Sequence, residues 1–253
     1  MTPTDSPPPI PPEEHPLQPF LPPHARLLML GSFPPQKKRW YMDFYYPNFI
    51  NDMWRIMGYI FHGDRNWFVD ERAKCFKKEM IVEFLLDKGI ALYDTAFFSR
   101  RLQDNAADKF LEVVTPTDLP RLLGQIPRCT AIVTTGQKAT DTLCDTFHIS
   151  QPVIGSFSPF VTEGRELRLY RMPSSSRAYY YVDDVLAYDQ TTRNNVYNTR
   201  LRIDFQTVRP ELTNNDMRLN GDPREAYNEA ADNSETGGKA GGFNYYAPKG
   251  YIE

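Results

Sequence analysis

Residues 26–200 contain four short apolar stretches. The segments between them have apolar residues at helical spacing. The four stretches read RLLML, IALYD, AIVTT and RLYRM. The first three are apolar on both faces, which is typical of parallel strands covered on both sides, while the fourth alternates. Strands that alternate with helices in this way predict a three-layer α/β/α domain around a four-stranded parallel sheet, with helices on both faces.

The helical pattern occurs in five segments, residues 51–61, 72–89, 115–126, 137–148 and 177–201. Asn51 or Asp52 can cap the first helix, and Gly89 is a typical stop signal for the second. The last segment is expected to close the domain.

Composition sets the limits of this domain. Residues 1–25 are rich in proline, which removes backbone donors, so we expect an extended N-terminal arm outside the core. Residues 26–204 are predicted to form the α/β domain. Residues 205–253 are polar and include the sequence GGKAGG, so they are predicted to form a C-terminal extension with little buried surface.

The chain has 253 residues and a net charge of −3, so its overall charge does not indicate a nucleic-acid partner. The cysteines at positions 75, 129 and 144 are isolated and odd in number, which argues against a disulfide framework and favours a reducing compartment. We find no basic and apolar leader at the start and no run of about 18 apolar residues. We therefore expect a cytoplasmic protein that does not span a membrane.

Unusual residues follow each predicted strand, at Gly31–Pro35, Asp94, Thr134–Gly136 and Pro173–Ser176. Ligands of parallel α/β sheets bind at the carboxyl ends of the strands, so a site is expected there. Asp94 either belongs to this site or only caps the next segment.

The loop after the first strand holds several aromatic and amide side chains. Aromatic residues before a helix are commonly core or staple residues. Asn51 is equally well explained as a helix cap, and the serines at 174–176 as an ordinary turn. These simpler explanations are compatible with a site, because a cap also fixes the side chain that reads a ligand.

The order of these motifs resembles the uracil-DNA glycosylase superfamily. LGSFPP…FYYPNFINDMW is similar to its first motif, with Gly31, Tyr46, Asn51 and Trp54 in the order and at the spacing of the mismatch-specific (G:T/U) branch. MPSSS, Met172–Ser176, is similar to the second motif, and GIALYDT and AIVTTGQKA look like the two intermediate strands. The Gly-Ser-Phe-Pro start is most similar to the hypoxanthine-DNA glycosylase-like group.

This resemblance covers roughly residues 15–182 and implies a metal-free, cofactor-free, monomeric enzyme. Such an enzyme would excise a deaminated base, uracil or hypoxanthine, in base excision repair. It would be monofunctional, because no lysine lies inside a motif to form a Schiff base. The implied base-binding residues are Gly31, Ser32, Phe33, Tyr46 and Ser174.

The implied catalytic residue is Asn51, and Asn48 is a rival because Phe49 replaces the proline that often precedes the asparagine. The sequence also departs from the larger branches. Phe33 occupies the place of their water-positioning Asn or Asp, and it cannot polarise water. None of the four histidines is near a motif in the sequence; they are His15, His24, His62 and His148.

Basic residues cluster at the same predicted edge of the sheet, where phosphate contacts are expected. The candidate DNA contacts, together with the serines of the second motif, are Lys37, Lys38, Arg39, Arg100, Arg101, Ser175, Ser176 and Arg177. The expected partner is damaged or mismatched duplex DNA, or single-stranded DNA.

Two other functions remain open. The chain could be a glycosylase fold that binds nucleic acid but has lost hydrolysis, which the phenylalanine at position 33 motivates. It could also be a flavodoxin-like small-molecule binder that holds a phosphate at Gly31 and a helix start. The length of the loop from Gly31 to Asn51 argues against this last function.

Overall fold

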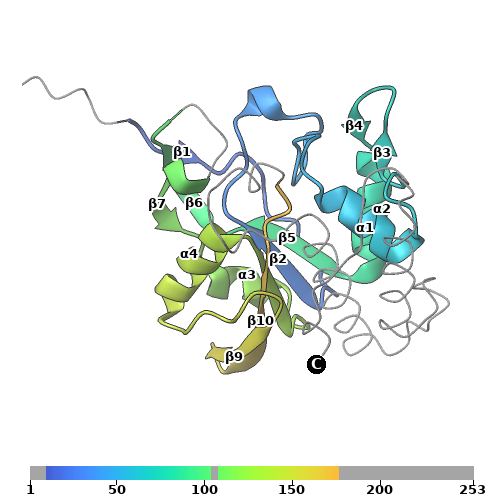
Figure 1. The fold of residues 1–253 in the computed structure, drawn as a ribbon. Helices are drawn as coiled ribbons and strands as arrows, with labels where there is room; N and C mark the ends of the chain where they lie inside the picture. Colours follow the sequence, from blue (N-terminus) through green and yellow to red (C-terminus); the bar gives the residue numbers. More distant parts are fainter. Residues whose placement is uncertain (1–9, 104–107, 177–253) are drawn as a thin grey trace, which may run out of the picture.

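The computed structural model describes residues 10–103 and 108–176, and its arrangement is drawn in Figure 1. The expected closing helix at 177–201, the candidate DNA contact Arg177 and the expected extension at 205–253 lie outside the described residues.

A mostly parallel sheet of five strands forms the centre of the domain. The strand order is β5-β2-β8-β10-β9, with the bounds Ile90–Asp94, Leu27–Gly31, Ala131–Thr135, Arg165–Met172 and Phe157–Thr162. The first four strands are parallel, and all four predicted stretches are among them.

The predicted number of four strands is wrong, because β9 adds an antiparallel edge strand next to β10. A two-residue turn, Glu163 and Gly164, joins them, and both residues have positive φ, 48° and 70°. This backbone is typical of tight hairpins. The Glu-Gly pair between two alternating stretches was therefore a signal for the missed strand.

The register of the sheet brings the strand ends together. Gly31 at the end of β2 pairs with Asp94 at the end of β5, and Met172 of β10 pairs with Thr135 of β8. Residues far apart in the sequence therefore meet at one edge of the sheet.

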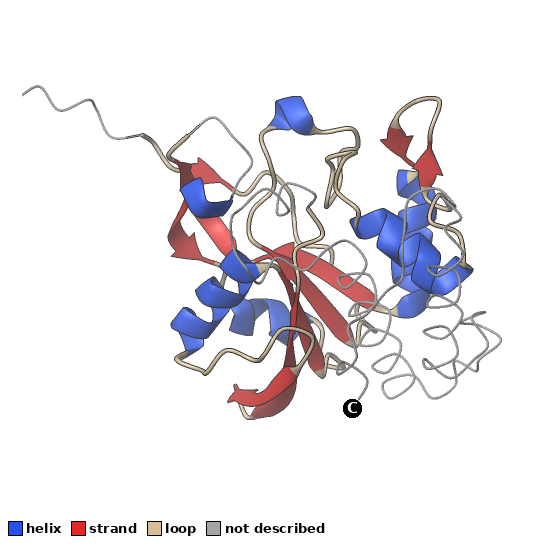
Figure 2. Ribbon diagram, viewed as in Figure 1, coloured by secondary structure: helices blue, strands red, loops and turns tan. Residues whose placement is uncertain are grey.

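Helices lie on both sides of the sheet, with α1 and α2 on one side and α3 and α4 on the other (Figures 1 and 2). Their bounds are Met53–His62, Lys78–Lys88, Leu119–Gln125 and Gln137–Phe147. Gly89 ends α2 in the left-handed conformation, as predicted. The helix starts later than expected, because a small hairpin, β3 (Val69–Asp70) and β4 (Cys75–Phe76), occupies the preceding residues.

A second, three-stranded sheet was not predicted. Its order is β1-β6-β7, with the bounds Glu13–Glu14, Ala96–Arg101 and Leu111–Pro116, and a short helix, η2 (Asp108–Phe110), precedes β7. The strand β1 belongs to the proline-rich N-terminal stretch.

The interpretation of residues 1–25 as an arm outside the core is wrong for residues 13–20. His15 is only 5% exposed, and Phe20 forms a backbone bridge with Leu92 of the central sheet. Proline has no N–H to donate, so it is excluded from the inner strands of a sheet. A proline-rich segment can still add a short strand at the edge of a sheet. The other domain limits stay predictions.

Candidate functional site

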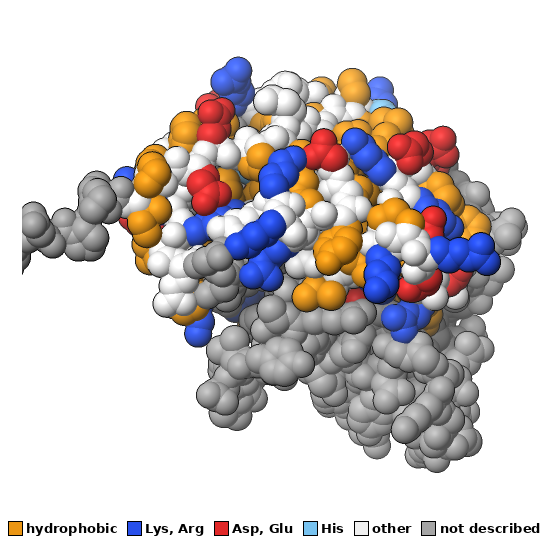
Figure 3. Space-filling view, turned by 90° about the horizontal axis from the view of Figure 1, so that it is seen from above, with side chains coloured by type: hydrophobic (Ala, Val, Ile, Leu, Met, Phe, Trp, Pro, Cys, Tyr) orange, Lys and Arg blue, Asp and Glu red, His pale blue; other side chains and the backbone are white. Residues whose placement is uncertain are grey.

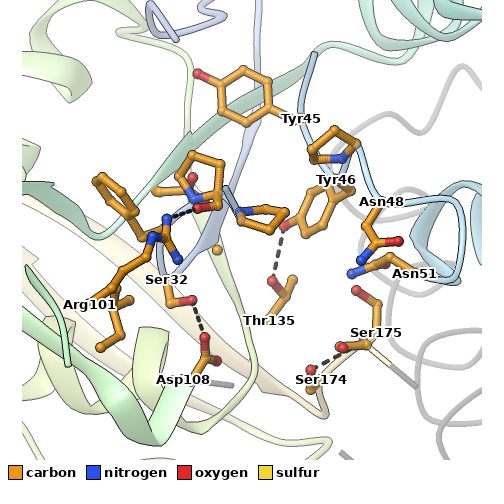
Figure 4. Close-up of a pocket in the computed structure, with 18 residues that line it drawn as sticks. Ser32, Tyr45, Tyr46, Asn48, Asn51, Arg101, Asp108, Thr135, Ser174 and Ser175 are labelled. Carbon is orange, nitrogen blue, oxygen red and sulfur yellow. Dashed lines mark hydrogen bonds between the residues drawn. The ribbon is translucent and has the colours of Figure 1, made fainter. Parts of the chain in front are cut away.

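A pocket of about 100 Å³ opens at the carboxyl ends of the parallel strands (Figure 4). This is several times the volume of one water molecule, about 30 Å³. The lining residues come from every loop that the sequence had singled out: Gly31, Ser32, Phe33, Pro34, Pro35, Tyr45, Tyr46, Pro47, Asn48, Asn51, Asp94, Arg101, Asp108, Leu111, Thr135, Ser174, Ser175 and Ser176. All predicted catalytic and base-binding residues are among them, and their roles stay predictions.

Gly31 and Asp94 both line this pocket and lie next to each other. A Cβ atom on Gly31 would lie 2.3 Å from Oδ1 of Asp94, so only glycine leaves room for the carboxylate. The side chain of Asp94 is 9% exposed. Glycine is therefore favoured at position 31 because the register of β2 and β5 places the Asp94 side chain directly beside it.

We expect Gly31→Ala to displace the Asp94 carboxylate and to destabilise the protein by about 1–3 kcal/mol, as overpacking of a core does. Denaturant unfolding measures this change. Gly124→Ala is the matched control, because Gly124 lies in helix α3 with nothing within 4 Å of the added carbon. That substitution should stabilise by about 0.5–1 kcal/mol. Equal stability of the wild type and Gly31→Ala would contradict the close approach.

His15 holds the second oxygen of Asp94. Its Nε2 lies 2.8 Å from Oδ2 of Asp94, and its Nδ1 lies 3.2 Å from the backbone nitrogen and 2.9 Å from the backbone oxygen of Leu17. The imidazole packs edge-on against Phe33, with ring centroids 5.4 Å apart, and lies 4.5 Å from the ring of Tyr93.

Sequence reasoning missed this pair. Every histidine was expected to lie away from the motifs, which holds along the chain but is wrong in space for His15. Seventy-nine positions separate His15 from Asp94, so no local pattern joins them. The pairing of β1 with β6 and the bridge between Phe20 and Leu92 place the His15 segment beside the end of β5.

Tyr46 forms one wall of the pocket in an unusual backbone conformation. Its φ is +50°, which is uncommon for a residue other than glycine and recurs at binding sites. Its hydroxyl lies 2.9 Å from Oγ1 of Thr135, and its ring meets Trp54 edge-on at 6.0 Å. Burial, and then the Asp94 carboxylate, raises the pKa of Tyr46, so its hydroxyl stays protonated.

The loop that carries Tyr46 is fixed to helix α1. The indole nitrogen of Trp54, which is fully buried, donates a hydrogen bond to the carbonyl of Tyr45 at 3.0 Å. Arg55 donates to the carbonyl of Phe49 at 2.7 Å and lies over its ring at 4.5 Å. The aromatic run therefore includes true core residues, as the simpler explanation held, and the same packing presents Tyr46 to the pocket.

The two asparagines lie side by side at the pocket wall (Figure 4). Oδ1 of Asn51 accepts a hydrogen bond from the backbone N–H of Met53 at 2.9 Å, and Oδ1 of Asn48 accepts one from Ile50 at 3.2 Å. These bonds use the oxygens, so each Nδ2 keeps its two donors. Within the described part of the chain, neither nitrogen has a hydrogen-bond partner.

The side-chain oxygen of Asn51 therefore caps helix α1 in part, while its amide nitrogen can still donate to a ligand in the pocket. Asp52 precedes the first helical residue but makes no capping bond with its own side chain, so the Asn51 oxygen supports the first turn of α1. The two explanations offered by the sequence are compatible in this geometry.

The serine loop is tied to the start of the same helix. Ser175 accepts a backbone hydrogen bond from Asp52 at 3.0 Å, and Ser176 forms a backbone bridge with Asn51. Oγ of Ser174 accepts from the backbone N–H of Ser176 at 3.2 Å, which is the turn that a serine run favours. The two predicted motifs thus form one continuous wall.

Asp108 is a pocket residue that the sequence did not identify. Oγ of Ser32 donates to Oδ1 of Asp108 at 2.8 Å, and burial raises the pKa of that carboxyl. Asp108 lies in a segment for which no strand or helix had been predicted. A polar residue after a short Arg-Arg strand carries no distinctive signal of its own.

The two predicted arginine contacts differ in their surroundings. The side chain of Arg101 is only 9% exposed; it pairs with Glu13 at 3.1 Å and donates to the carbonyl of Pro34. It is therefore a wall of the pocket. Arg100 is more exposed and lies 3.3 Å from Glu112.

The remaining described basic cluster, Lys37–Arg39, forms the short helix η1 next to the pocket loop. Lys37 lies 2.7 Å from Asp43 and 3.7 Å from the centre of the Trp40 ring. This hydrogen bond is the main cause that lowers the pKa of Asp43. Figure 3 looks down on the molecule from above and shows basic side chains among acidic ones over this face.

In residues 10–103 and 108–176, no group of three or more His, Cys, Asp or Glu side chains could hold a metal ion. No helix within these ranges is long and apolar enough to cross a bilayer.

Comparison with known proteins gives little further guidance. No model of a known protein family matches the chain, and no curated protein matches it. One solved structure that is similar is the solution NMR structure of "a putative Uracil DNA glycosylase" from Methanosarcina acetivorans. It shares 19% sequence identity with a TM-score of 0.47, over 76% of this chain and 95% of that chain. A likeness of this size carries no argument about function, so the geometry of the pocket has to carry it.

Proposed function

We propose that this protein is a DNA glycosylase that hydrolyses the N-glycosidic bond of a deaminated base, uracil or hypoxanthine. The observation that carries the proposal is the pair of amides, Asn48 and Asn51, whose donors line the same pocket as the ring of Tyr46. A ring to stack on and donors toward a base edge are what an extruded base requires.

The chemistry of the donors favours deaminated bases. Deamination replaces the amino group of cytosine or adenine, a donor, by a carbonyl, an acceptor. An amide N–H₂ whose oxygen is already engaged can donate to that carbonyl but has nothing to offer an amino group. The same donors would stabilise negative charge on the departing base.

The surroundings of the pocket suit a DNA partner. The serine loop lines the pocket, and the Lys37–Arg39 helix follows the lining residues Pro34 and Pro35 in the chain; phosphate and groove contacts are expected from both segments. Arg100 and Arg101 pair with Glu112 and Glu13, and Lys37 pairs with Asp43, so a phosphate bound by any of these three side chains competes with an acidic partner. We propose a cytoplasmic monomer that needs no cofactor.

A binding protein without hydrolysis is the second candidate. Phe33 is buried and packs against His15 and beneath Arg101, so it offers no polar atom to orient water. A protein of this kind would bind the extruded base without cleaving it.

Strand-cleavage assays distinguish these functions. Purified full-length protein is incubated with oligonucleotides that carry one uracil or one hypoxanthine, both single-stranded and in duplexes, and abasic sites are then cleaved with alkali. A glycosylase should yield cleavage only at the modified position and none in an undamaged duplex. Binding selective for the modified duplex without cleavage would favour the binding protein, and neither activity would exclude both.

A further inference from the structure

The buried pair His15 and Asp94 has no part in the function proposed so far. We infer that Asp94 is the catalytic residue that accepts the proton of the attacking water, and that His15 is the positioning residue that holds its carboxylate. This inference rests on the proposed glycosylase function and supplies the polar group that Phe33 lacks.

The geometry divides the two oxygens of Asp94 between two tasks. Oδ2 lies 2.8 Å from Nε2 of His15, whereas Oδ1 faces Gly31, and both Gly31 and Asp94 line the pocket. A side chain at position 31 would occupy that space. One oxygen is therefore anchored, and the other lies where a water molecule in the pocket can reach it.

His15 is itself held rigidly. Its Nδ1 is within hydrogen-bond distance of the backbone of Leu17, and its ring is enclosed by Phe33, Tyr45 and Tyr93. An ionised carboxylate only accepts hydrogen bonds, so in its contact with Asp94 the Nε2 of His15 is the donor. Nδ1 then either accepts from the N–H of Leu17 at 3.2 Å or donates to its carbonyl at 2.9 Å, and both arrangements keep Nε2–H directed at Asp94. The second nitrogen thus fixes the orientation of the first.

The other ionisable groups near Asp94 do not compete with it as a base. Its charge helps to raise the pKa values of Tyr45, Tyr46 and Tyr93, in each case after burial, and that of Tyr93 rises to about 12. These hydroxyls are therefore neutral. Asp108, which also lines the pocket, has a pKa raised mainly by burial and accepts a hydrogen bond from Ser32, so it is the weaker candidate for a base.

The proposed step is a hydrolysis in which all atoms are accounted for. The water oxygen forms a bond to C1′ of the extruded nucleotide, and its proton passes to Oδ1 of Asp94. The bond from C1′ to the base nitrogen breaks, and its electron pair leaves with the base. The base then takes up a proton from solvent, and Asp94 returns its own to solvent, which leaves an abasic sugar and the free base.

Four variants test this inference: Asp94→Asn, His15→Phe, His15→Gln and, as a histidine control, His24→Gln. His24 also bonds a backbone oxygen, that of Leu86, at 2.6 Å, but lies away from the pocket. For each variant we would measure the single-turnover excision rate and, separately, the dissociation constant for the substrate duplex. Thermal unfolding checks that each variant is folded.

Asp94→Asn should lose about 10²–10⁴-fold in rate, the usual contribution of a general base, with little change in DNA binding. His15→Phe keeps an aromatic ring but loses the donor. Its excision rate should fall about tenfold or more below that of the wild type, because the base is no longer held in place. His15→Gln, whose amide can donate to Asp94, should recover most of the rate, and His24→Gln should match the wild type.

Three outcomes overturn the inference. Wild-type excision in Asp94→Asn excludes the catalytic role while the glycosylase function stands. Equal rates in His15→Gln and His15→Phe reduce His15 to a packing residue. If the wild type excises no base, the inference fails together with the proposed function.

Should His15→Phe not fold, ¹⁵N spectra of the wild-type histidines decide: a His15 proton on Nε2 supports the arrangement, and a neutral ring protonated on Nδ1 contradicts it.

Discussion

Replacing Asn51 by alanine is expected to lower the single-turnover rate of base excision by about 10²–10³-fold, the effect of losing one donor that stabilises developing charge. The amide nitrogen lines the pocket and has no partner among the described residues, so its donors are available to the departing base. Binding of undamaged duplex should change little, because these donors do not face phosphates in this role.

The capping bond complicates this experiment. Asn51 also accepts from the N–H of Met53, and losing a cap costs about 1 kcal/mol of stability. Asn51→Asp separates the two effects, since the carboxylate caps equally well but cannot donate to a base carbonyl. We expect it to unfold like the wild type and to excise as slowly as Asn51→Ala. Should Asn51→Ala excise at the wild-type rate, Asn48→Ala becomes the decisive variant, because its amide has the same free donors.

The four parallel strands were predictable because three of them are continuous apolar runs and the fourth alternates between apolar and polar residues. The four stretches appear as β2, β5, β8 and β10, each pair in parallel register. The antiparallel strands β9, β6 and β7 were missed because their burial alternates irregularly and they carry more polar residues. Strands of this kind depend on pairing with a neighbour, and the neighbour is not visible in the local sequence.

The wall of the pocket was predictable for the same reason. Parallel strands bring their carboxyl ends to one edge, so Gly31, Tyr46, Asn51 and Ser174 had to come close once the strands were placed. The contacts of three other residues, His15, Asp108 and Arg101, depend on the second sheet and the segments next to its strands. Their positions in the sequence have no regular spacing from the motifs, so the sequence did not predict these contacts.

Replacing Tyr46 by alanine is the second substitution from which we expect a large effect, here on DNA affinity. It tests whether the ring stacks on an extruded base or only packs within the protein. An aromatic ring under an extruded base contributes about 1–3 kcal/mol by alanine substitution, so affinity should fall about tenfold to a hundredfold. The probe is a duplex with a 2′-fluoro analogue of the excised nucleotide, whose glycosidic bond resists cleavage, and binding is measured at fixed salt.

Tyr46→Phe is the matched control for that measurement. It keeps the ring and loses only the hydrogen bond to Thr135, which should cost about 0.5–1.5 kcal/mol of stability and little affinity. Affinity for an undamaged duplex should be unchanged in both variants, since no base then has to occupy the pocket. Equal losses in alanine and phenylalanine would assign the effect to the Thr135 bond, and equal losses on damaged and undamaged DNA would assign it to the shape of the strained loop at φ +50°. A loss confined to Tyr46→Ala and to the modified duplex is the result that stacking alone explains.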